Sequence, residues 1–563
     1  MNSRPFDSPA TSPLGNWRTV LTVAAVVVVG CVAITGRSLW IDEACTATKA
    51  VPPTLGGWWQ ALSQDRSADL QMPLYMFYVW GWSRLFGSSE WSLHSANAPW
   101  FIAGAVAFIL AFPPSDRRRS AACVVLLCPF AWYYLDEARP YTMQLGATLL
   151  IVAALTRLVR DVSGDSGGNH ETRRPNIQHP TSNIQHPMTA QTDPVGCWML
   201  DVGCWMFPTT SGFHVALFLF GLVVLCGSSL LGMVWAGGAL AAMPALLSLR
   251  RVVSLMKRYW CLWLSTGALL LVLAGYYLWA LSLGARASAS ATTTLASVCF
   301  VGYEVLGFGG LVPGRLELRT AGLAALRPHL IWLVLYGVAI AIQMGAAALQ
   351  EVKGMNRKHL VLAFCCGVPP AFILAVGCVA HFRVLGRHFA PIVPVLLLLS
   401  ASGLAWLWSR HGAWARVVAL AFCGLSLLSC LSLRFSPRHE KDNYRAAAAW
   451  ARTALSKGQL VWWNAAAVGA QYYDVPLTTD PGRGSAALLV LNPARGTLSL
   501  LPLPQVIVAS KPDLYDGQSA LAELLREQHF QPAGKFNAFV IWERSGPWRA
   551  EGRENAFLHQ RSS

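Results

Sequence analysis

The stretch Arg37-Ser38-Leu39-Trp40-Ile41-Asp42-Glu43 places two adjacent carboxylates directly after the first long apolar segment, at about 20–34. That segment predicts a first membrane span, which puts Asp42 and Glu43 at a membrane face. Charged side chains there are costly unless they meet water, a cation or a substrate, so both are candidate functional residues. The alternative interpretation is an acid pair that only ends a helix.

The composition is that of a polytopic membrane protein: of 563 residues, 54% are hydrophobic and 13% are charged. The net charge is +16, but the basic residues lie in short clusters between apolar runs. This distribution indicates orientation across a membrane, and we expect no nucleic-acid partner. The 14 Cys mostly lie inside apolar runs without metal-type spacing, which is typical of small buried hydrophobic residues.

The apolar runs predict a mainly α fold with about eleven transmembrane helices, and the first outer loop, 37–91, is rich in Trp and predicts interfacial helices. Basic clusters such as Arg117-Arg118-Arg119 place the N-terminus in the cytoplasm and the C-terminus outside. Residues 1–16 are polar and predict a disordered cytoplasmic tail. The predicted spans lie at about 20–34, 93–112, 121–134, 142–158, 213–226, 230–247, 260–281, 329–349, 360–380, 390–408 and 417–433.

Residues 161–211 interrupt this pattern with two short duplications. Asn-Ile-Gln-His-Pro begins at 176 and again at 183, and Val-Gly-Cys-Trp-Met begins at 195 and again at 202. We interpret the segment as a low-complexity insertion in a cytoplasmic loop. A metal site is the alternative, and its ligands would be Cys197, Cys204, His179 and His186.

From about residue 434 the pattern changes to that of a small α/β domain outside the membrane, residues 434–563. Helices are predicted at 441–456 and about 520–528. Short strands are predicted at 460–463, 487–491, 505–509 and 538–542.

With this topology the acids and several arginines gather in the outer loops. Acids and arginines together near a bilayer suit a reaction in which a hydroxyl is deprotonated while a lipid-linked phosphate leaves. A single interfacial Arg can instead simply contact lipid headgroups. The acids are Asp42, Glu43, Asp65, Asp69, Glu90, Asp136, Glu137, Glu304 and Glu317, and the arginines are Arg37, Arg139, Arg315, Arg319, Arg383 and Arg387.

Four ordered motifs resemble those of GT-C glycosyltransferases, in the bacterial branch that includes protein mannosyltransferase-like, lipid A aminoarabinose and lipopolysaccharide-core transferases. The resemblance covers residues 17 to about 433 and is strongest over the first 141. The motifs are Leu39-Trp40-Ile41-Asp42-Glu43-Ala44, Asp69-Leu70-Gln71-Met72-Pro73-Leu74-Tyr75, Trp80 with Phe86-Gly87-Ser88-Ser89-Glu90-Trp91-Ser92-Leu93, and Glu137-Ala138-Arg139-Pro140-Tyr141.

The resemblance implies a polyprenyl-phosphate-sugar donor, an acceptor that is a lipid, glycan or protein, and inversion at the anomeric carbon, in the cytoplasmic membrane. Asp42 would be the general base or the carboxylate that orients the acceptor. Glu43 and Asp69 would position it or bind acceptor or metal. In the second outer loop, Arg139 and Tyr141 would line the site, and Asp136 or Glu137 would match a second acidic position of some relatives.

Gly386-Arg387-His388-Phe389-Ala390-Pro391 resembles a late motif of the same enzymes. We expect Arg387, with Arg139 and His388, to bind the donor phosphate. His388 stands where relatives commonly have Tyr, and His94 where they have Arg, so a phosphate contact there would depend on pH. The resemblance leaves a divalent metal ion open as a cofactor, with Asp42, Glu43 or Glu137 as its ligands.

Two other classes of protein share some of these features. A transporter or flippase of lipid-linked saccharides would have the spans and the arginines, but such proteins place ionisable groups and broken helices near mid-membrane. A non-catalytic scaffold for the outer domain would leave the ordered acidic motifs unexplained. We therefore predict a membrane glycosyltransferase.

Overall fold

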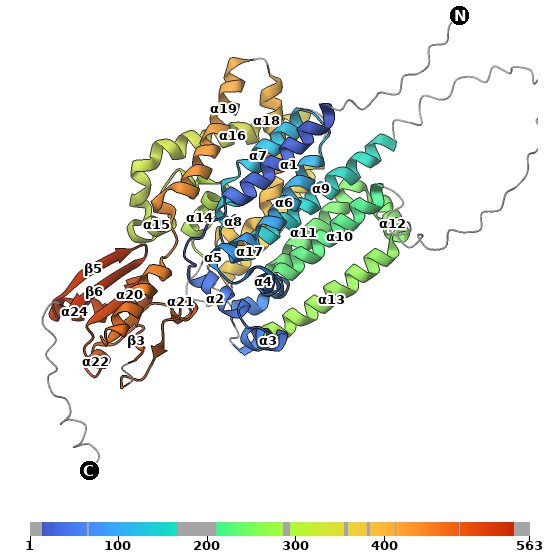
Figure 1. The fold of residues 1–563 in the computed structure, drawn as a ribbon. Helices are drawn as coiled ribbons and strands as arrows, with labels where there is room; N and C mark the ends of the chain where they lie inside the picture. Colours follow the sequence, from blue (N-terminus) through green and yellow to red (C-terminus); the bar gives the residue numbers. More distant parts are fainter. Residues whose placement is uncertain are drawn as a thin grey trace, which may run out of the picture. The chain divides into compact units, whose positions relative to one another are not determined.

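The structure is a computed structural model that describes residues 14–64, 67–165, 210–284, 293–353, 358–379, 383–410, 412–482 and 485–544. The chain forms two compact units (Figure 1). The membrane unit comprises Met1–Gly36 and Lys49–His439, and the C-terminal unit comprises Arg37–Thr48 and Glu440–Ser563. Most of the predicted tail and most of the predicted insertion at 161–211 lie outside the described residues.

The membrane unit is helical, and the chain is a multi-pass membrane protein. Within the described residues, nine helical stretches are long and apolar enough to cross a bilayer. They are Glu90–Leu110, Tyr141–Asp161, Ser211–Ser228, Leu230–Leu247, Trp260–Ser282, Arg315–Gln350, Val361–Val379, Gly386–Ser409 and Ala413–Phe435.

Two of the eleven predicted spans differ from the helices observed. The predicted span at 20–34 corresponds to α1 (Leu14–Val32), whose apolar part, Thr19–Val32, is short for a crossing. The predicted span at 121–134 is divided between α7 (Asp116–Leu126) and α8 (Pro129–Leu135). Pro129 explains the division, because proline has no N–H to continue a helix and is favoured at the first helical position.

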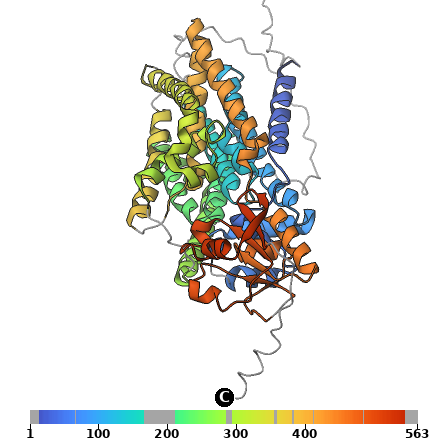
Figure 2. The same cartoon turned by 90° about the vertical axis from the view of Figure 1, so that its left-hand side faces the viewer.

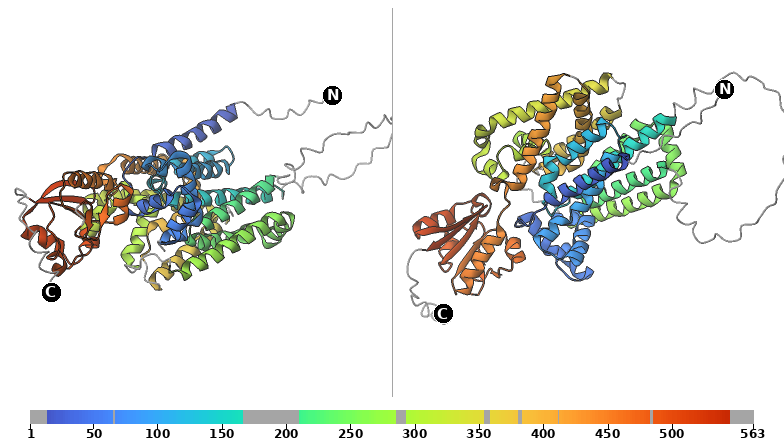
Figure 3. Two further views of the ribbon diagram at one scale, coloured as in Figure 1. Left: turned by 60° about the horizontal axis from the view of Figure 1, so that its bottom comes forward. Right: turned by 45° about the horizontal axis from the view of Figure 1, so that its top comes forward.

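Helix α9 (Tyr141–Asp165) lies in the interior of the membrane unit, packed against α6 (Ala98–Leu110) and α10 (Thr210–Ser228). Of the most apolar 18 residues of α9, 83% are buried. The corresponding share for α13 (Trp260–Ser282) is 6%, so α13 lies at the edge of the membrane unit. Helix α10 runs side by side with both α11 (Leu230–Leu247) and α13, the green helices of Figure 3.

The remaining helices of the membrane unit complete the bundle or connect its members. The longer ones are α16 (Leu330–Lys353), α17 (Lys358–Val379), α18 (Val393–Ser409) and α19 (Ala413–Phe435). The shorter ones are α3 (Leu55–Gln64), η1 (Ala68–Gln71), α4 (Pro73–Phe86), α5 (Glu90–Ser95), α12 (Leu249–Arg258), α14 (Leu295–Val305), η2 (Phe308–Gly310), α15 (Arg315–Ala321), η3 (Gly322–His329), η4 (Gly386–Ile392) and η5 (Pro437–His439).

Most of the C-terminal unit is drawn in orange and red in Figure 2. It contains a six-stranded mixed sheet in the order β2-β3-β1-β4-β6-β5. The first four strands of that order are parallel, and β6 and β5 add an antiparallel edge. The strands are β1 (Val461–Asn464), β2 (Leu477–Thr478), β3 (Ala487–Leu489), β4 (Val506–Ser510), β5 (Phe530–Phe536) and β6 (Phe539–Arg544). The helices are α20 (Tyr444–Ser456), α21 (Ala467–Tyr472), α22 (Arg495–Leu498), α23 (Pro512–Tyr515) and α24 (Ala520–Glu527), together with most of α2 (Ile41–Ala50).

Both faces of this sheet are covered. Trp463 on β1 packs into a core with α20 and α21, whereas its neighbour Trp462 packs into a second core with α22 and α24. Alternating side chains of a strand point to opposite faces, which explains why both tryptophans are buried. The four predicted strands and two predicted helices agree with the observed elements to within three residues, while β2 and β5 were not predicted.

Candidate functional site

A buried charge cluster forms around Asp69 in the membrane unit. Asp69 lies in η1, whose first turn is capped by the Ser67 hydroxyl. Its carboxylate accepts hydrogen bonds from Lys49 Nζ at 2.5 Å and from Arg139 at 2.7 Å. All three side chains are less than a tenth exposed. Charge-assisted bonds of this kind are short and strong, so the cluster fixes the loop before α9 against residues 49–69.

The cations decide the protonation state of Asp69. Burial alone would raise the pKa of this carboxyl, but the charges of Arg139 and Lys49, with the hydrogen bonds that both donate, outweigh burial and hold the pKa below its ordinary value. Asp69 is therefore an anion at neutral pH. Because its charge is engaged by two cations, it acts in this structure as an anchor for Lys49 and Arg139.

Two other predicted residues meet beside this cluster. Tyr141 begins α9, two residues after Arg139. The guanidinium carbon of Arg387, on η4, lies 5.6 Å from the centre of the Tyr141 ring, within the range of a cation–π contact. The structure thus brings together Asp69, Arg139, Tyr141 and Arg387, which come from three separate motifs of the sequence.

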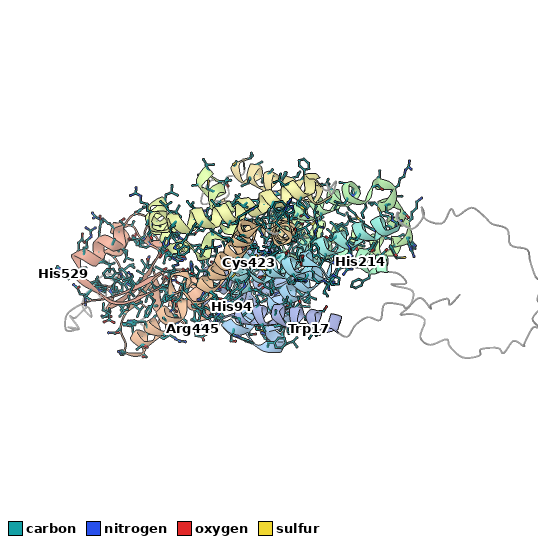
Figure 4. The ribbon with its side chains drawn as sticks, turned by 90° about the horizontal axis from the view of Figure 1, so that it is seen from above. Trp17, His94, His214, Cys423, Arg445 and His529 are labelled. Atoms are coloured by element: carbon teal, nitrogen blue, oxygen red, sulfur yellow. The ribbon has the colours of Figure 1, made fainter. Side chains whose placement is uncertain are left out.

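Asp136 and His94 form a different buried contact. Asp136 accepts hydrogen bonds from the Thr35 N–H at 2.6 Å and from the Thr35 hydroxyl at 2.8 Å. His94 Nδ1 lies 2.7 Å from the Thr35 carbonyl oxygen, which cannot donate, so Nδ1 carries the proton. His94 is fully buried among the helices, where Figure 4 labels it. These contacts tie the residues that follow α1 to the loop between α8 and α9.

The structure also places Glu137 and His388. Glu137 is fully buried, and its backbone carbonyl accepts hydrogen bonds from Asn97 and from the Arg139 N–H, both at 2.6 Å. His388 is half-buried on η4, and its Nδ1 accepts the Leu385 N–H at 3.3 Å. This nitrogen therefore caps its own helix.

Arg315 and Glu304 form a further ion pair, and neither residue belongs to one of the motifs. Arg315 contacts Glu304 at 2.5 Å and donates to the Tyr134 hydroxyl at 2.7 Å. The other Glu304 oxygen accepts the Gly386 N–H at 2.9 Å. A pocket lies here, lined by aromatic rings that include Tyr133 and Tyr134. The sequence feature that could have identified this pair is Glu304, an acid within the apolar helix α14, followed by several arginines.

Asp42 and Glu43 lie in the C-terminal unit, in the first turn of α2, where negative charge is favourable. Glu43 is fully buried and pairs with Lys441 Nζ at 2.8 Å. Its second oxygen accepts the Trp40 N–H at 3.1 Å. Asp42 is only half-buried.

The described residues contain no group of three or more His, Cys, Asp or Glu side chains that could hold a metal ion. Glu43, one of the three acids predicted as ligands, is paired with an ammonium group instead. We therefore derive no step through a metal ion.

No protein-family model matches the sequence, and no curated protein matches it. Among solved structures, ArnT from Cupriavidus metallidurans in the apo state aligns over 95% of this chain and 100% of its own, with a TM-score of 0.50 and 13% identity. The chain has the fold of ArnT. The fold predicted from the motifs is therefore confirmed.

Two further solved structures align with lower TM-scores. ArnT bound to undecaprenyl phosphate aligns with a TM-score of 0.48 and 15% identity, over 95% of this chain and 99% of its own. The arabinofuranosyltransferase AftD from Mycobacteria aligns with a TM-score of 0.37 and 11% identity, over 97% of this chain and 41% of its own.

Proposed function

We propose that this protein is a membrane glycosyltransferase that moves a sugar from a polyprenyl-phosphate donor to a hydroxyl or amine group of a lipid, glycan or protein. One observation supports this above others. Residues from three motifs that suggested the activity, Asp69, Arg139 and Arg387, gather in one part of a chain that has the fold of ArnT.

The arginines suit the leaving group. As the glycosidic bond breaks, negative charge grows on the donor phosphate, and a guanidinium can meet two phosphate oxygens at once. Arg139 is held by Asp69, and Arg387 lies over the Tyr141 ring, so both are oriented before a donor arrives. Such preorganised charge stabilises a transition state most effectively where water is excluded.

Asp42 suits the acceptor. In the proposed step, Asp42 takes the proton of the acceptor hydroxyl, and the acceptor oxygen attacks the anomeric carbon. The bond from that carbon to the phosphate oxygen breaks, and the polyprenyl phosphate leaves with the electron pair, which inverts the anomeric configuration. General base catalysis by one such group typically contributes about 100-fold to 10,000-fold in rate.

The proposal includes a location and a topology. Nucleotide sugars are made in the cytoplasm, so a lipid-linked donor fits a reaction on the outer face of the cytoplasmic membrane. We propose that the N-terminus is cytoplasmic and that the domain at 434–563 is extracytoplasmic. In the domain at 17–433, we count α1 as one further crossing and the α7–α8 pair as another. Together with the nine helical stretches found in the described residues, they make the predicted eleven spans.

A comparison of cells tests the proposed activity. Envelope glycans and lipids of cells lacking this protein are analysed by mass spectrometry, with and without wild-type protein or an Asp42→Asn variant. We expect one sugar to be missing from an acceptor, to return with the wild type, and to stay missing with Asp42→Asn at equal protein level.

Asp474→Asn is the matched control, because Asp474 is an exposed acid of the same C-terminal unit. It should restore the sugar fully. Restoration by Asp42→Asn would remove the proposed role of Asp42, and unchanged glycans in cells lacking the protein would oppose the activity itself.

A further inference from the structure

We infer that the C-terminal unit holds the segment Ser38–Glu43 in place through Tyr473 and Lys441, which makes these two residues positioning residues for Asp42. This inference rests on the proposed function of Asp42. It gives the C-terminal unit a role in the reaction, although no motif in that unit indicated one.

The first contact is made by Tyr473, which directly follows α21. Its hydroxyl accepts the Leu39 N–H at 2.9 Å and lies 3.1 Å from the Ser38 hydroxyl. Tyr473 is only 9% exposed, so its ring is fixed by the core of the unit. A buried phenol of this kind needs a polar partner, and the segment supplies one.

The second contact is made with α20. The Ser38 hydroxyl oxygen accepts the N–H of Arg445, the second residue of that helix, at 3.1 Å. Figure 4 labels Arg445 on this helix. The first N–H groups of a helix have no partner within it and are usually satisfied by a capping side chain. Here Ser38 contributes to that cap from a position 407 residues earlier in the chain.

The third contact is the ion pair of Glu43 and Lys441. Glu43 is 0% exposed and the Lys441 side chain is 8% exposed, so neither charge is well hydrated. Removing one partner of such a pair leaves the other charge uncompensated, which strongly destabilises a structure. Ile41 adds an apolar contact to the core formed by α20 and α21.

These contacts separate the roles of the two acids. Adjacent helical residues do not face the same direction. Glu43 is directed into the unit and also accepts the Trp40 N–H, which fixes the first turn of α2. Asp42, next to it and half-buried, is the acid of the pair that the segment can present to a substrate. Its orientation then depends on Tyr473 and Lys441.

Kinetics of the full-length protein in lipid vesicles test this inference. We expect Lys441→Gln and Tyr473→Phe to lower kcat, by up to about 100-fold as is typical of a catalytic group displaced by about 1 Å, while the KM for the lipid donor stays unchanged. Lys441→Arg should recover most of the activity because it restores the charge. Lys457→Gln, the same substitution at an exposed lysine next to α20, should match the wild type.

The outcomes distinguish the inference from the proposed function. If Asp42→Asn is inactive while Lys441→Gln and Tyr473→Phe keep the wild-type kcat, the inference alone is overturned. If Asp42→Asn is fully active, the proposed role of Asp42 fails and the inference fails with it.

A second measurement covers the case in which Lys441→Gln does not fold. A benzophenone amino acid at position 473 is activated by light in the full-length protein, and the cross-linked peptides are identified by mass spectrometry. Cross-links to the segment 37–48 support the inference. Cross-links found only elsewhere would overturn it.

Discussion

At the scale of single residues, the Asp69 cluster illustrates what motifs can and cannot predict. Asp69 and Arg139 each belong to an ordered motif, and the structure pairs them at 2.7 Å. Lys49 belongs to no motif, although it makes the shorter bond to Asp69. It lies 20 residues from Asp69 in a segment without a motif, and a single lysine near a membrane face is ordinarily explained by contact with lipid headgroups.

Replacing Asp69 should destabilise the protein by leaving two buried cations without their shared carboxylate. We expect Asp69→Asn to lower the free energy of unfolding by about 3–5 kcal/mol, the usual cost of breaking a buried ion pair. Thermal or denaturant unfolding in detergent measures this loss. Asp116→Asn is the control, because Asp116 forms an exposed pair with Arg119 and such pairs contribute about 0–1 kcal/mol.

The stability that Asp69 contributes should depend on pH, and the direction follows from its pKa. The pKa of Asp69 in the folded protein lies below its ordinary value of 3.8, so the ion pair contributes fully above that value. The contribution is lost as pH falls through the lower folded pKa, where the carboxylate takes up a proton. The stability gap between the wild type and Asp69→Asn should therefore be constant near neutral pH and shrink in strong acid. A gap that widens as pH falls would contradict this assignment.

At the scale of elements, the sequence predicted most helices and strands because hydrophobic periodicity and length are strong signals. The predicted span at 121–134 is divided into two helices because Pro129 starts a new helix within an uninterrupted apolar run. Strand β2 has only two residues, too few for a pattern. Strand β5 contains Pro532 and Gly534 and is mostly exposed, so it lacks the apolar alternation of its partner β6.

Close packing of α9 against α6 depends on glycine. A Cβ added at Gly146 would lie 2.4 Å from the Trp100 carbonyl oxygen, and one at Gly104 would lie 2.7 Å from the Gly146 carbonyl oxygen. Small residues allow such backbone approach between membrane helices. The contact positions the start of α9, where Tyr141 lies.

We expect Gly146→Ala to destabilise the protein by about 1–3 kcal/mol, because backbone atoms cannot move aside as a flexible side chain can. Thermal unfolding in detergent measures the effect. Gly267→Ala is the matched control on α13, since a Cβ there meets nothing within 4 Å. Equal stability of the two variants would show that α6 and α9 are not packed this closely.

At the scale of the whole molecule, the ordered motifs predicted the fold, and the alignment with ArnT confirms it. The assignment of residues 37–48 to the C-terminal unit could not be predicted. It depends on Tyr473, Lys441 and Arg445, which lie about 400 residues from the segment they contact and carry no motif. Hydrogen bonds between such distant positions leave no periodicity or spacing that a single sequence reveals.

The central claim is sugar transfer that requires Asp42, and the fate of the donor lipid tests it most directly. Purified protein in vesicles is supplied with the polyprenyl-phosphate sugars and acceptors extracted from its own cells, and free polyprenyl phosphate and glycosylated acceptor are quantified together. We predict that the wild type releases polyprenyl phosphate in equimolar amount to the sugar transferred and that Asp42→Asn releases none. Movement of intact lipid-linked sugar across the vesicle membrane without release of polyprenyl phosphate would contradict the account and favour a flippase.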